Sequence, residues 1–480
     1  MLFNSIDFLL FYLVVTVLFF SLPHRMRWAI LLIASCIFYM FFKPEYILIL
    51  GGTIVIDYIA GIQIAKAPTH ATKRLYLILS LVANIGVLAV FKYYNFINDN
   101  ITGIASLFGF SNNIPALTII LPIGLSFHTF QAMSYTIEVY RGHQQPEKHF
   151  GIYSLYVMFY PQLVAGPIER PQNMLHQFWE RQKFDHDRFM SGLRLMGWGL
   201  FKKVVIADRL SIVVDELYAG TYGYNTIWVI LGTFFFAYQI YCDFSGYSDM
   251  ALGSARTMGF TLMKNFNYPF QAKSITEYWR RWHISLSTWF NDYLYTPLII
   301  DRRDWGKWAV VFGLCITFFL SGLWHGAGWP FITWGVLHGL AISYEFLTKK
   351  TRKRIFGKLP KWLNNLSSQF FVFIFLQFVW IFFRADTFEK AFNVIKGIFN
   401  FTGCFEQLNY MPAALKYSIV VGFISLANFL IIEKCMRMDS MQKRFKESLV
   451  FRTFVFAYLF ILFIFFGSFK NAQSFIYFQF

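Results

Sequence analysis

The chain has 480 residues, of which 56% are hydrophobic and only 14% are charged. About a quarter of the residues in a soluble domain are charged, so this composition argues against a soluble protein and indicates a membrane protein. The net charge is +17, but the basic residues occur in short clusters between apolar segments. This distribution is typical of cytoplasmic loops and argues against nucleic-acid binding.

Repeated apolar segments predict a polytopic, all-α protein, because a spanning helix needs about 20 apolar residues. We expect about eleven spans, near residues 6–22, 28–42, 46–65, 75–97, 115–140, 226–244, 308–324, 329–347, 366–384, 411–433 and 452–470. Two further apolar segments, near 150–166 and 189–217, contain proline, glycine or charged residues. We expect these two to be re-entrant or interfacial, where protein or water surrounds them.

Lysine and arginine are distributed unevenly among the connecting loops. They occur in 24–27, 66–74 and 349–361, whereas 98–114 contains neither. Basic loops face the cytoplasm in most membrane proteins. We therefore expect these basic loops to be cytoplasmic and the N-terminus to face outward.

A histidine interrupts two apolar segments at a glycine-rich break. The sequence of 321–330 is Ser-Gly-Leu-Trp-His-Gly-Ala-Gly-Trp-Pro, with His325 at its centre. Ionisable groups inside a membrane are costly and mark functional sites, which makes His325 a candidate catalytic residue. His338 lies in the next apolar segment, where a structural hydrogen bond between helices explains it as well as a catalytic role does.

Residues 239–305 form a long stretch that is both polar and aromatic. Its charges argue against a span and its aromatic residues argue against a soluble loop, so we expect amphipathic helices in or dipping into the membrane. Glu277 and Arg281 are spaced to pair on one helix face. For the arginines, the alternative to a functional role is that they only anchor the chain at the membrane interface. For His283, the alternative is a structural hydrogen bond at that interface.

His283 and His325 meet at one buried point if the stretch around 277–295 folds into the membrane. Histidine has a suitable pKa to accept a proton from a hydroxyl near neutral pH. Other chemistries lack support, because the chain has no phosphate loop, dinucleotide fingerprint or nucleophile elbow. The five cysteines are scattered, and we expect neither a disulfide framework nor a metal site.

Several motifs together resemble a known family. Trp-Arg-Arg-Trp-His-Ile-Ser-Leu-Ser at 279–287 and Gly-Leu-Trp-His-Gly-Ala at 322–327 are similar to the membrane-bound O-acyltransferase family, and most similar to its bacterial alginate O-acetyltransferase branch. Further matching motifs lie at 121–127, 160–168, 199–208, 243–249 and 379–385. Asn291 and 296–300 depart from the pattern of that branch.

The resemblance implies one domain over residues 1–480, with a ring of helices around a central acyl-transfer tunnel. It implies transfer of an acyl group from a cytoplasmic thioester to hydroxyls of an exported or cell-surface polysaccharide, directly or through a periplasmic partner. Acetyl-CoA is the expected donor substrate, and no tightly bound cofactor is expected. The family's near-invariant histidine falls on His325, and its second polar position, Asn or His, falls on His283.

We expect His325 to act as general base, and His283 with Trp282 to position the thioester carbonyl or its tetrahedral intermediate. The other candidates for substrate or donor binding are Arg281, Trp324, Asp243, Tyr247, Asp292 and His338. D-alanyl or other acyl transfer to a cell-wall polymer remains open. So do a transporter of polysaccharide or lipid-linked sugar and a non-catalytic scaffold for polymer export.

Overall fold

The computed structural model describes residues 1–117, 122, 124–164, 166–404, 406, 410–469 and 475–478. Helices and their connections make up this part of the chain, and it contains no strand. The all-α fold class is therefore confirmed. Residues 121 and 123 of one motif, residue 165 of another and residues 118–121 and 123 of the span expected at 115–140 lie outside the described residues.

The first half of the chain contains α1 Ile6–Ser21, α2 His24–Met40, α3 Tyr46–Lys66, α4 His70–Leu88, the π-helix η1 Ala89–Tyr93, α5 Tyr94–Leu107, α6 Leu125–Arg141, α7 Phe150–Met158, α8 Pro171–Trp179, α9 His186–Phe201, the π-helix η2 Lys202–Ala207, α10 Asp208–Ala219 and α11 Thr226–Met258. The second half contains η3 Pro269–Gln271, α12 Ile275–Trp279, α13 Ile284–Phe290, η4 Asn291–Tyr295, α14 Thr296–Asp301, η5 Arg303–Trp305, α15 Lys307–His325, α16 Trp329–Leu347, α17 Lys349–Phe356, α18 Lys361–Arg384, α19 Phe388–Gly397, α21 Ala413–Arg437, α22 Asp439–Glu447, α23 Leu449–Phe466 and η6 Ile476–Phe478.

A helix lies in each predicted span, but the helix in the span expected at 115–140 begins only at Leu125, because the described residues 115–117 and 122 are not helical. Within the described residues, seven helices are long and apolar enough to cross a membrane. They are α3, the continuous helix 70–107, α11, α15, α18, α21 and α23. The chain is thus a multi-pass membrane protein, and the count of eleven spans stays a prediction.

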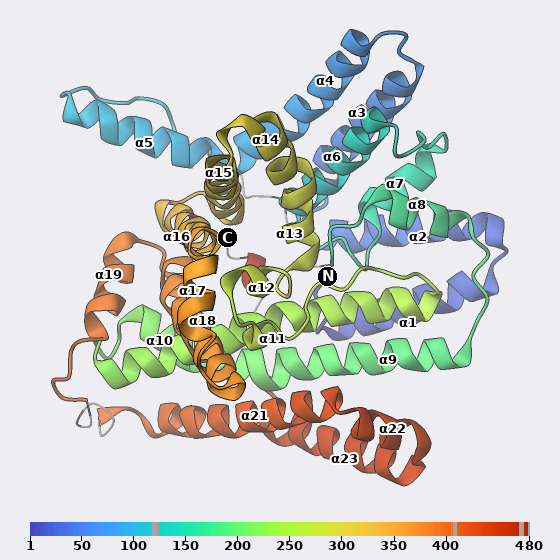
Figure 1. Cartoon of the computed structure of the whole chain (residues 1–480). Helices are drawn as coiled ribbons and strands as arrows, with labels where there is room; N and C mark the ends of the chain where they lie inside the picture. Colours follow the sequence, from blue (N-terminus) through green and yellow to red (C-terminus); the bar gives the residue numbers. More distant parts are fainter. Residues whose placement is uncertain are drawn as a thin grey trace.

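Helix α11 extends the span expected at 226–244 through residue 258. The first part of the polar and aromatic stretch at 239–305 is therefore a buried helix and not an interfacial one. Helix α9 lies alongside α11 (Figure 1), and glycines allow the close approach. A Cβ on Gly199 would lie 2.4 Å from the carbonyl oxygen of Gly246, so only glycine fits at this crossing.

Glycines also bring α15 and α16 together on either side of the break at His325. A Cβ on Gly322 would lie 2.4 Å from the carbonyl oxygen of Phe331, and one on Gly335 would lie 2.2 Å from that of Phe318. The two helices pack backbone to backbone, which holds the end of α15 at a fixed depth.

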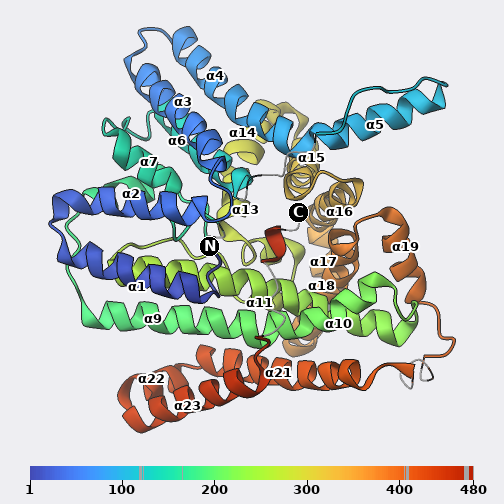
Figure 2. The ribbon, with the colours of Figure 1, turned by 180° about the vertical axis from the view of Figure 1, so that it is seen from behind.

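Short helices occupy the middle of the molecule. In Figure 1, α12 and α13 lie between the side formed by α1, α2 and α11 and the side formed by α15, α16 and α18. Figure 2 shows the turn η6, drawn in red, at the same central place. The centre therefore collects segments that are far apart in the sequence, and both candidate histidines border it.

Candidate active site

His325 is the last residue of α15 and is 5% exposed. The helix ends there because Gly326 and Gly328 adopt extended backbone conformations before α16 begins. Its ring lies among aromatic rings, with centroid distances of 4.9 Å to Trp324 and 5.0 Å to Trp334. Among the described residues, Nδ1 of His325 has no hydrogen-bond partner. A buried, polar nitrogen is thus left available to a substrate.

His283 lies between α12 and α13 and is fully buried. Its φ of 45° places it in the left-handed region, which is strained for a residue with a Cβ and often marks functional sites. Nδ1 lies 3.2 Å from Oδ1 of Asn265, and the backbone N–H of Ser285 donates to the same oxygen. That N–H identifies the Asn265 atom as an acceptor, so Nδ1 of His283 carries the proton.

Burial lowers the pKa of His283 to about 3, because the ring has left water. The ring is therefore neutral at physiological pH. Since Nδ1 is protonated, Nε2 is the acceptor nitrogen, and it has no hydrogen-bond partner among the described residues. His283 can accept a hydrogen bond at Nε2, but in this tautomer it cannot donate one there.

The two histidines share aromatic neighbours. The indole of Trp324 lies 6.3 Å from the His283 ring and 4.9 Å from the His325 ring, centroid to centroid. Tyr477 of η6 lies 6.4 Å from His283 and 5.7 Å from His325. The structure therefore brings His283, His325 and Trp324 together, as the sequence motifs indicated, and adds Tyr477 from the end of the chain.

The segment around Tyr477 is attached to α11. The backbone N–H of Ile476 donates to Oδ2 of Asp243 across 2.8 Å, and the Phe475 ring lies 4.5 Å from that of Tyr247. Asp243 also forms a buried ion pair with Lys203 at 2.8 Å. Of the sequence-predicted residues, Asp243 and Tyr247 thus hold the C-terminal turn and the buried Lys203.

His338 lies one aromatic ring away from His325. Trp334 separates them, at 5.0 Å from the His325 ring and 4.9 Å from the His338 ring. The indole N–H of Trp279 donates to Nδ1 of His338 across 3.2 Å. His338 therefore joins α12 to α16 by the inter-helix hydrogen bond that was one of its two expected roles.

Trp282, the neighbour of His283, is buried against other rings. It stacks on Tyr278 at 5.6 Å and lies 5.3 Å from Trp380 of α18. These contacts fix the turn that carries His283.

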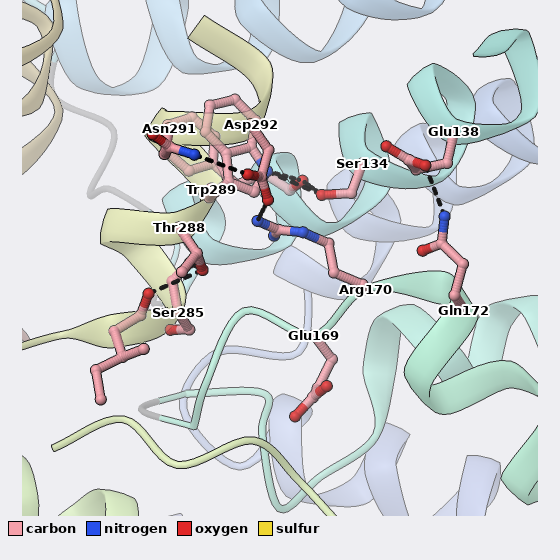
Figure 3. A network of polar contacts seen from close by, with 12 residues as sticks. Ser134, Glu138, Glu169, Arg170, Gln172, Ser285, Thr288, Trp289, Asn291 and Asp292 are labelled. Atoms are coloured by element: carbon pink, nitrogen blue, oxygen red, sulfur yellow. Dashed lines mark hydrogen bonds and ion pairs between the residues drawn. The ribbon is translucent and has the colours of Figure 1, made fainter. Parts of the chain in front are cut away.

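Arg281 and Asp292 are each engaged in an ion pair. Arg281 pairs with Glu277 at 2.8 Å, which confirms the predicted pairing although α12 ends at Trp279. Asp292 lies 3.1 Å from Arg170 (Figure 3), and its side chain is 46% exposed. None of the ring contacts or hydrogen bonds given above joins Arg281 or Asp292 to either histidine ring.

A cavity of about 790 Å³ lies between α12–α14 and α15–α16. Its lining includes the basic side chains of Arg280, Lys349 and Arg352, and also Glu345, whose carboxylate accepts from the backbone N–H groups at the start of α12. Its inner wall includes Leu286 and Ser321, and Ser321 lies one helical turn before His325 on the same face of α15. Of the two neighbouring arginines of the motif, Arg280 lines this cavity and Arg281 does not.

Three features of this site were absent from the sequence-based candidates. Asn265 lies in the aromatic stretch that the sequence did single out, but nothing in the sequence indicated its contact with His283. Tyr477 follows the last apolar segment and carries no motif. Lys92 Nζ donates to the carbonyl oxygens of Trp324 and His325, at 2.6 and 3.2 Å. These contacts join distant parts of the chain.

Comparison with known proteins agrees with the motifs. The family model of the membrane-bound O-acyltransferase family matches residues 149–385, which include both histidines. The probable alginate O-acetylase AlgI of Pseudomonas aeruginosa is 38% identical over 436 residues, covering 89% of this chain and 80% of that protein. The chain belongs to the membrane-bound O-acyltransferase family. It is therefore an O-acyltransferase.

Other relatives of this O-acyltransferase act on different polymers by name. The peptidoglycan O-acetyltransferase of Helicobacter pylori is 36% identical over 78% of this chain and 74% of that protein. The teichoic acid D-alanyltransferase of Bacillus subtilis is 28% identical over 53% of this chain and 66% of that protein.

Proposed function

We propose that the enzyme transfers an acetyl group from a cytoplasmic thioester, acetyl-CoA, to hydroxyls of an exported or cell-surface polysaccharide, directly or through a periplasmic partner. The observation that carries the proposal is the shared environment of His283 and His325 against Trp324. Two buried imidazoles that lie against one indole and have nitrogens available suit proton transfer at a hydroxyl.

The donor enters through the cavity between α12–α14 and α15–α16. Its polar end includes Lys349 and Arg352, which belong to the basic segment that the charge distribution assigns to the cytoplasm. With Arg280, these side chains bind the phosphates of the donor. The thioester then extends along the apolar wall toward the face of α15 that carries Ser321 and His325.

His325 acts as the general base. The attacking hydroxyl transfers its proton to the imidazole as its oxygen bonds to the thioester carbonyl carbon, and the thiolate leaves with a proton from the imidazolium. His283 accepts, at Nε2, a hydrogen bond from a second hydroxyl of the acceptor sugar and so orients the acceptor, while the single hydrogen of the attacking hydroxyl points at His325. This role follows from the protonated Nδ1, which leaves Nε2 without a hydrogen to donate to an oxyanion.

Acetyl is favoured over D-alanyl as the transferred group. The two O-acetyltransferases cited above match 89% and 78% of the chain, whereas the D-alanyltransferase matches 53%. The enzyme sits in the bacterial inner membrane with its N-terminus outside. Transport of a lipid-linked sugar would not explain why two buried histidines lie against the indole of Trp324.

The experiment compares a deletion strain with strains that express the wild-type enzyme or His325→Ala at equal membrane level. Mild alkali releases ester-linked groups from the purified envelope polymers, and chromatography separates acetate from D-alanine. Acetate that depends on His325 supports the proposal. D-alanine in its place would identify the other acyl group, and release unchanged in all strains would refute an acyltransferase role at the envelope.

A further inference from the structure

The end of α15 is held from outside by the long helix 70–107. This helix continues from α4 through η1 into α5, and Figure 2 shows α5 beginning next to α15. Lys92 and Tyr93 of η1 point their polar atoms at the last turn of α15. The carbonyl oxygen of Trp324 accepts from Lys92 Nζ at 2.6 Å, and that of Leu323 accepts from the Tyr93 hydroxyl at 3.0 Å.

These contacts satisfy carbonyl groups that the helix itself cannot. The last four carbonyls of a helix have no partner within it, and inside a membrane each unsatisfied group costs several kcal/mol. Lys92 Nζ also lies 3.2 Å from the carbonyl oxygen of His325. One side-chain nitrogen therefore binds the backbone of the candidate base and of the residue before it.

The π-helix explains how adjacent residues reach the same target. In an α-helix, consecutive side chains diverge by about 100° around the axis. The wider turn of η1, which spans Ala89–Tyr93, changes that register and directs both polar groups at one helix end. Single π-helical turns within long helices occur frequently at functional sites.

The same helix also binds the residue that begins α16. The indole N–H of Trp329 donates to Oδ1 of Asn100 across 2.9 Å, and the Phe96 ring lies 5.7 Å from the Trp329 ring. Both sides of the glycine break are thus attached to residues 92–100. Gly326 and Gly328 provide little side-chain packing of their own, so the break depends on these external contacts.

We propose that Lys92 is a positioning residue for His325: its side-chain nitrogen fixes the end of α15 and thereby the imidazole among its aromatic neighbours. Tyr93 and Asn100 complete the attachment. This inference rests on the proposed function, because it assigns Lys92 a role through the catalytic use of His325. Lys92 itself is placed on the backbone of α15 and not on the reacting atoms.

The test uses inside-out membrane vesicles that retain the natural acceptor, with radiolabelled acetyl-CoA as the probe. Alkali-labile label in polymer is measured against acetyl-CoA concentration, which gives an apparent kcat and KM. The variants are Lys92→Met, Lys92→Arg and Tyr93→Phe. Lys66→Met is the matched control, since Lys66 is exposed at the end of α3.

We expect Lys92→Met to lower the apparent kcat by about 10- to 100-fold, as when a catalytic group is displaced by about 1 Å. The KM for acetyl-CoA stays unchanged, and Lys92→Arg recovers part of the rate because it restores a cationic donor. Lys66→Met behaves as wild type. If Lys92→Met does not accumulate in the membrane, Tyr93→Phe provides the test, with a smaller fall in kcat at unchanged KM.

A kcat within twofold of wild type in an accumulating Lys92→Met variant would overturn the inference, as would equal losses in the Met and Arg variants. In the absence of Lys92→Met protein, an unchanged kcat in Tyr93→Phe would overturn it. His325→Ala separates this result from the proposed function. If His325→Ala abolishes labelling and Lys92→Met does not change it, the positioning role alone fails. If His325→Ala retains labelling, the proposed function fails.

Discussion

Asn265 fixes the tautomer of His283. Its Oδ1 lies 3.2 Å from Nδ1 of the imidazole and accepts from the backbone N–H and the hydroxyl of Ser285, at 3.2 and 3.0 Å. Nε2 of His283 is thereby left as the acceptor nitrogen of the ring. The orientation of this ring depends on a residue that comes eighteen positions earlier in the chain.

Replacement of Asn265 tests the tautomer argument. We expect Asn265→Leu to lower acetyl transfer at least about tenfold, because the imidazole can then rotate or exchange its proton to Nε2. Asn265→Asp keeps an acceptor at the same place and retains more of the rate. Ser285→Ala removes only the hydroxyl, one of the three donors to the same oxygen, and serves as the control. Equal rates for Asn265→Leu and Asn265→Asp would contradict the argument.

The lowered pKa of His283 makes stability depend on pH. In the unfolded chain the ring takes up a proton below its ordinary pKa of 6.5, whereas the folded protein resists protonation until about pH 3. The unfolded state therefore binds more protons in this range, and the stabilising contribution is lost as pH falls from about 6.5 toward 3. His283→Asn, which also tolerates the left-handed backbone, should lose less stability between pH 7 and pH 5. Thermal unfolding in nanodiscs measures this, and parallel losses in both proteins would contradict it.

The close packing of α15 and α16 predicts a difference between two glycines. Gly335→Ala places a methyl group 2.2 Å from the carbonyl oxygen of Phe318 and should destabilise the fold by about 1–3 kcal/mol. Gly86→Ala meets nothing within 4 Å and should be neutral or stabilise by about 0.5–1 kcal/mol. Unfolding temperatures of the two variants provide the comparison. If both changes had a similar effect on the unfolding temperature, the close approach of α15 and α16 would not restrict residue 335 to glycine.

The basic end of the cavity predicts a change in donor binding. The double variant Arg280→Glu with Arg352→Glu should raise the KM for acetyl-CoA by about five- to tenfold, as expected for a change of about 1 kcal/mol at solvated ion contacts. The difference should shrink at high salt. Lys350→Glu changes an exposed neighbouring charge that is outside the cavity lining and should leave KM unchanged. Equal KM changes in the two proteins would place the donor elsewhere.

Local patterns in the sequence predicted much of the helical framework. Apolar segments located the helices, and the spacing of Glu277 and Arg281 predicted their ion pair, because both signals depend only on neighbouring residues. The extent of α11 was underestimated. Its second half is polar, but those side chains are buried against α9 and the C-terminal turn, as with Asp243, which binds Lys203 and the N–H of Ile476.

Contacts between distant segments could not be predicted in this way. Asn265, Lys92 and Tyr477 reach the histidines from three different parts of the chain, and no spacing rule relates these parts. The sequence showed the glycine break at His325. It did not show that Lys92 and Tyr93 donate to the carbonyl oxygens at the end of α15. Motif resemblance identified the two histidines but gave no information about what orients them.

In the proposed reaction, His325 takes the proton of the acceptor hydroxyl. The most direct measurement is the transfer of label from radiolabelled acetyl-CoA into alkali-labile polymer by inside-out vesicles containing wild-type enzyme, His325→Ala or His325→Gln at equal abundance. Both variants should lose about 100- to 10,000-fold in rate, the range that general acid–base catalysis contributes, with thermal stability close to wild type. Rates near wild type in either variant would contradict this role of His325.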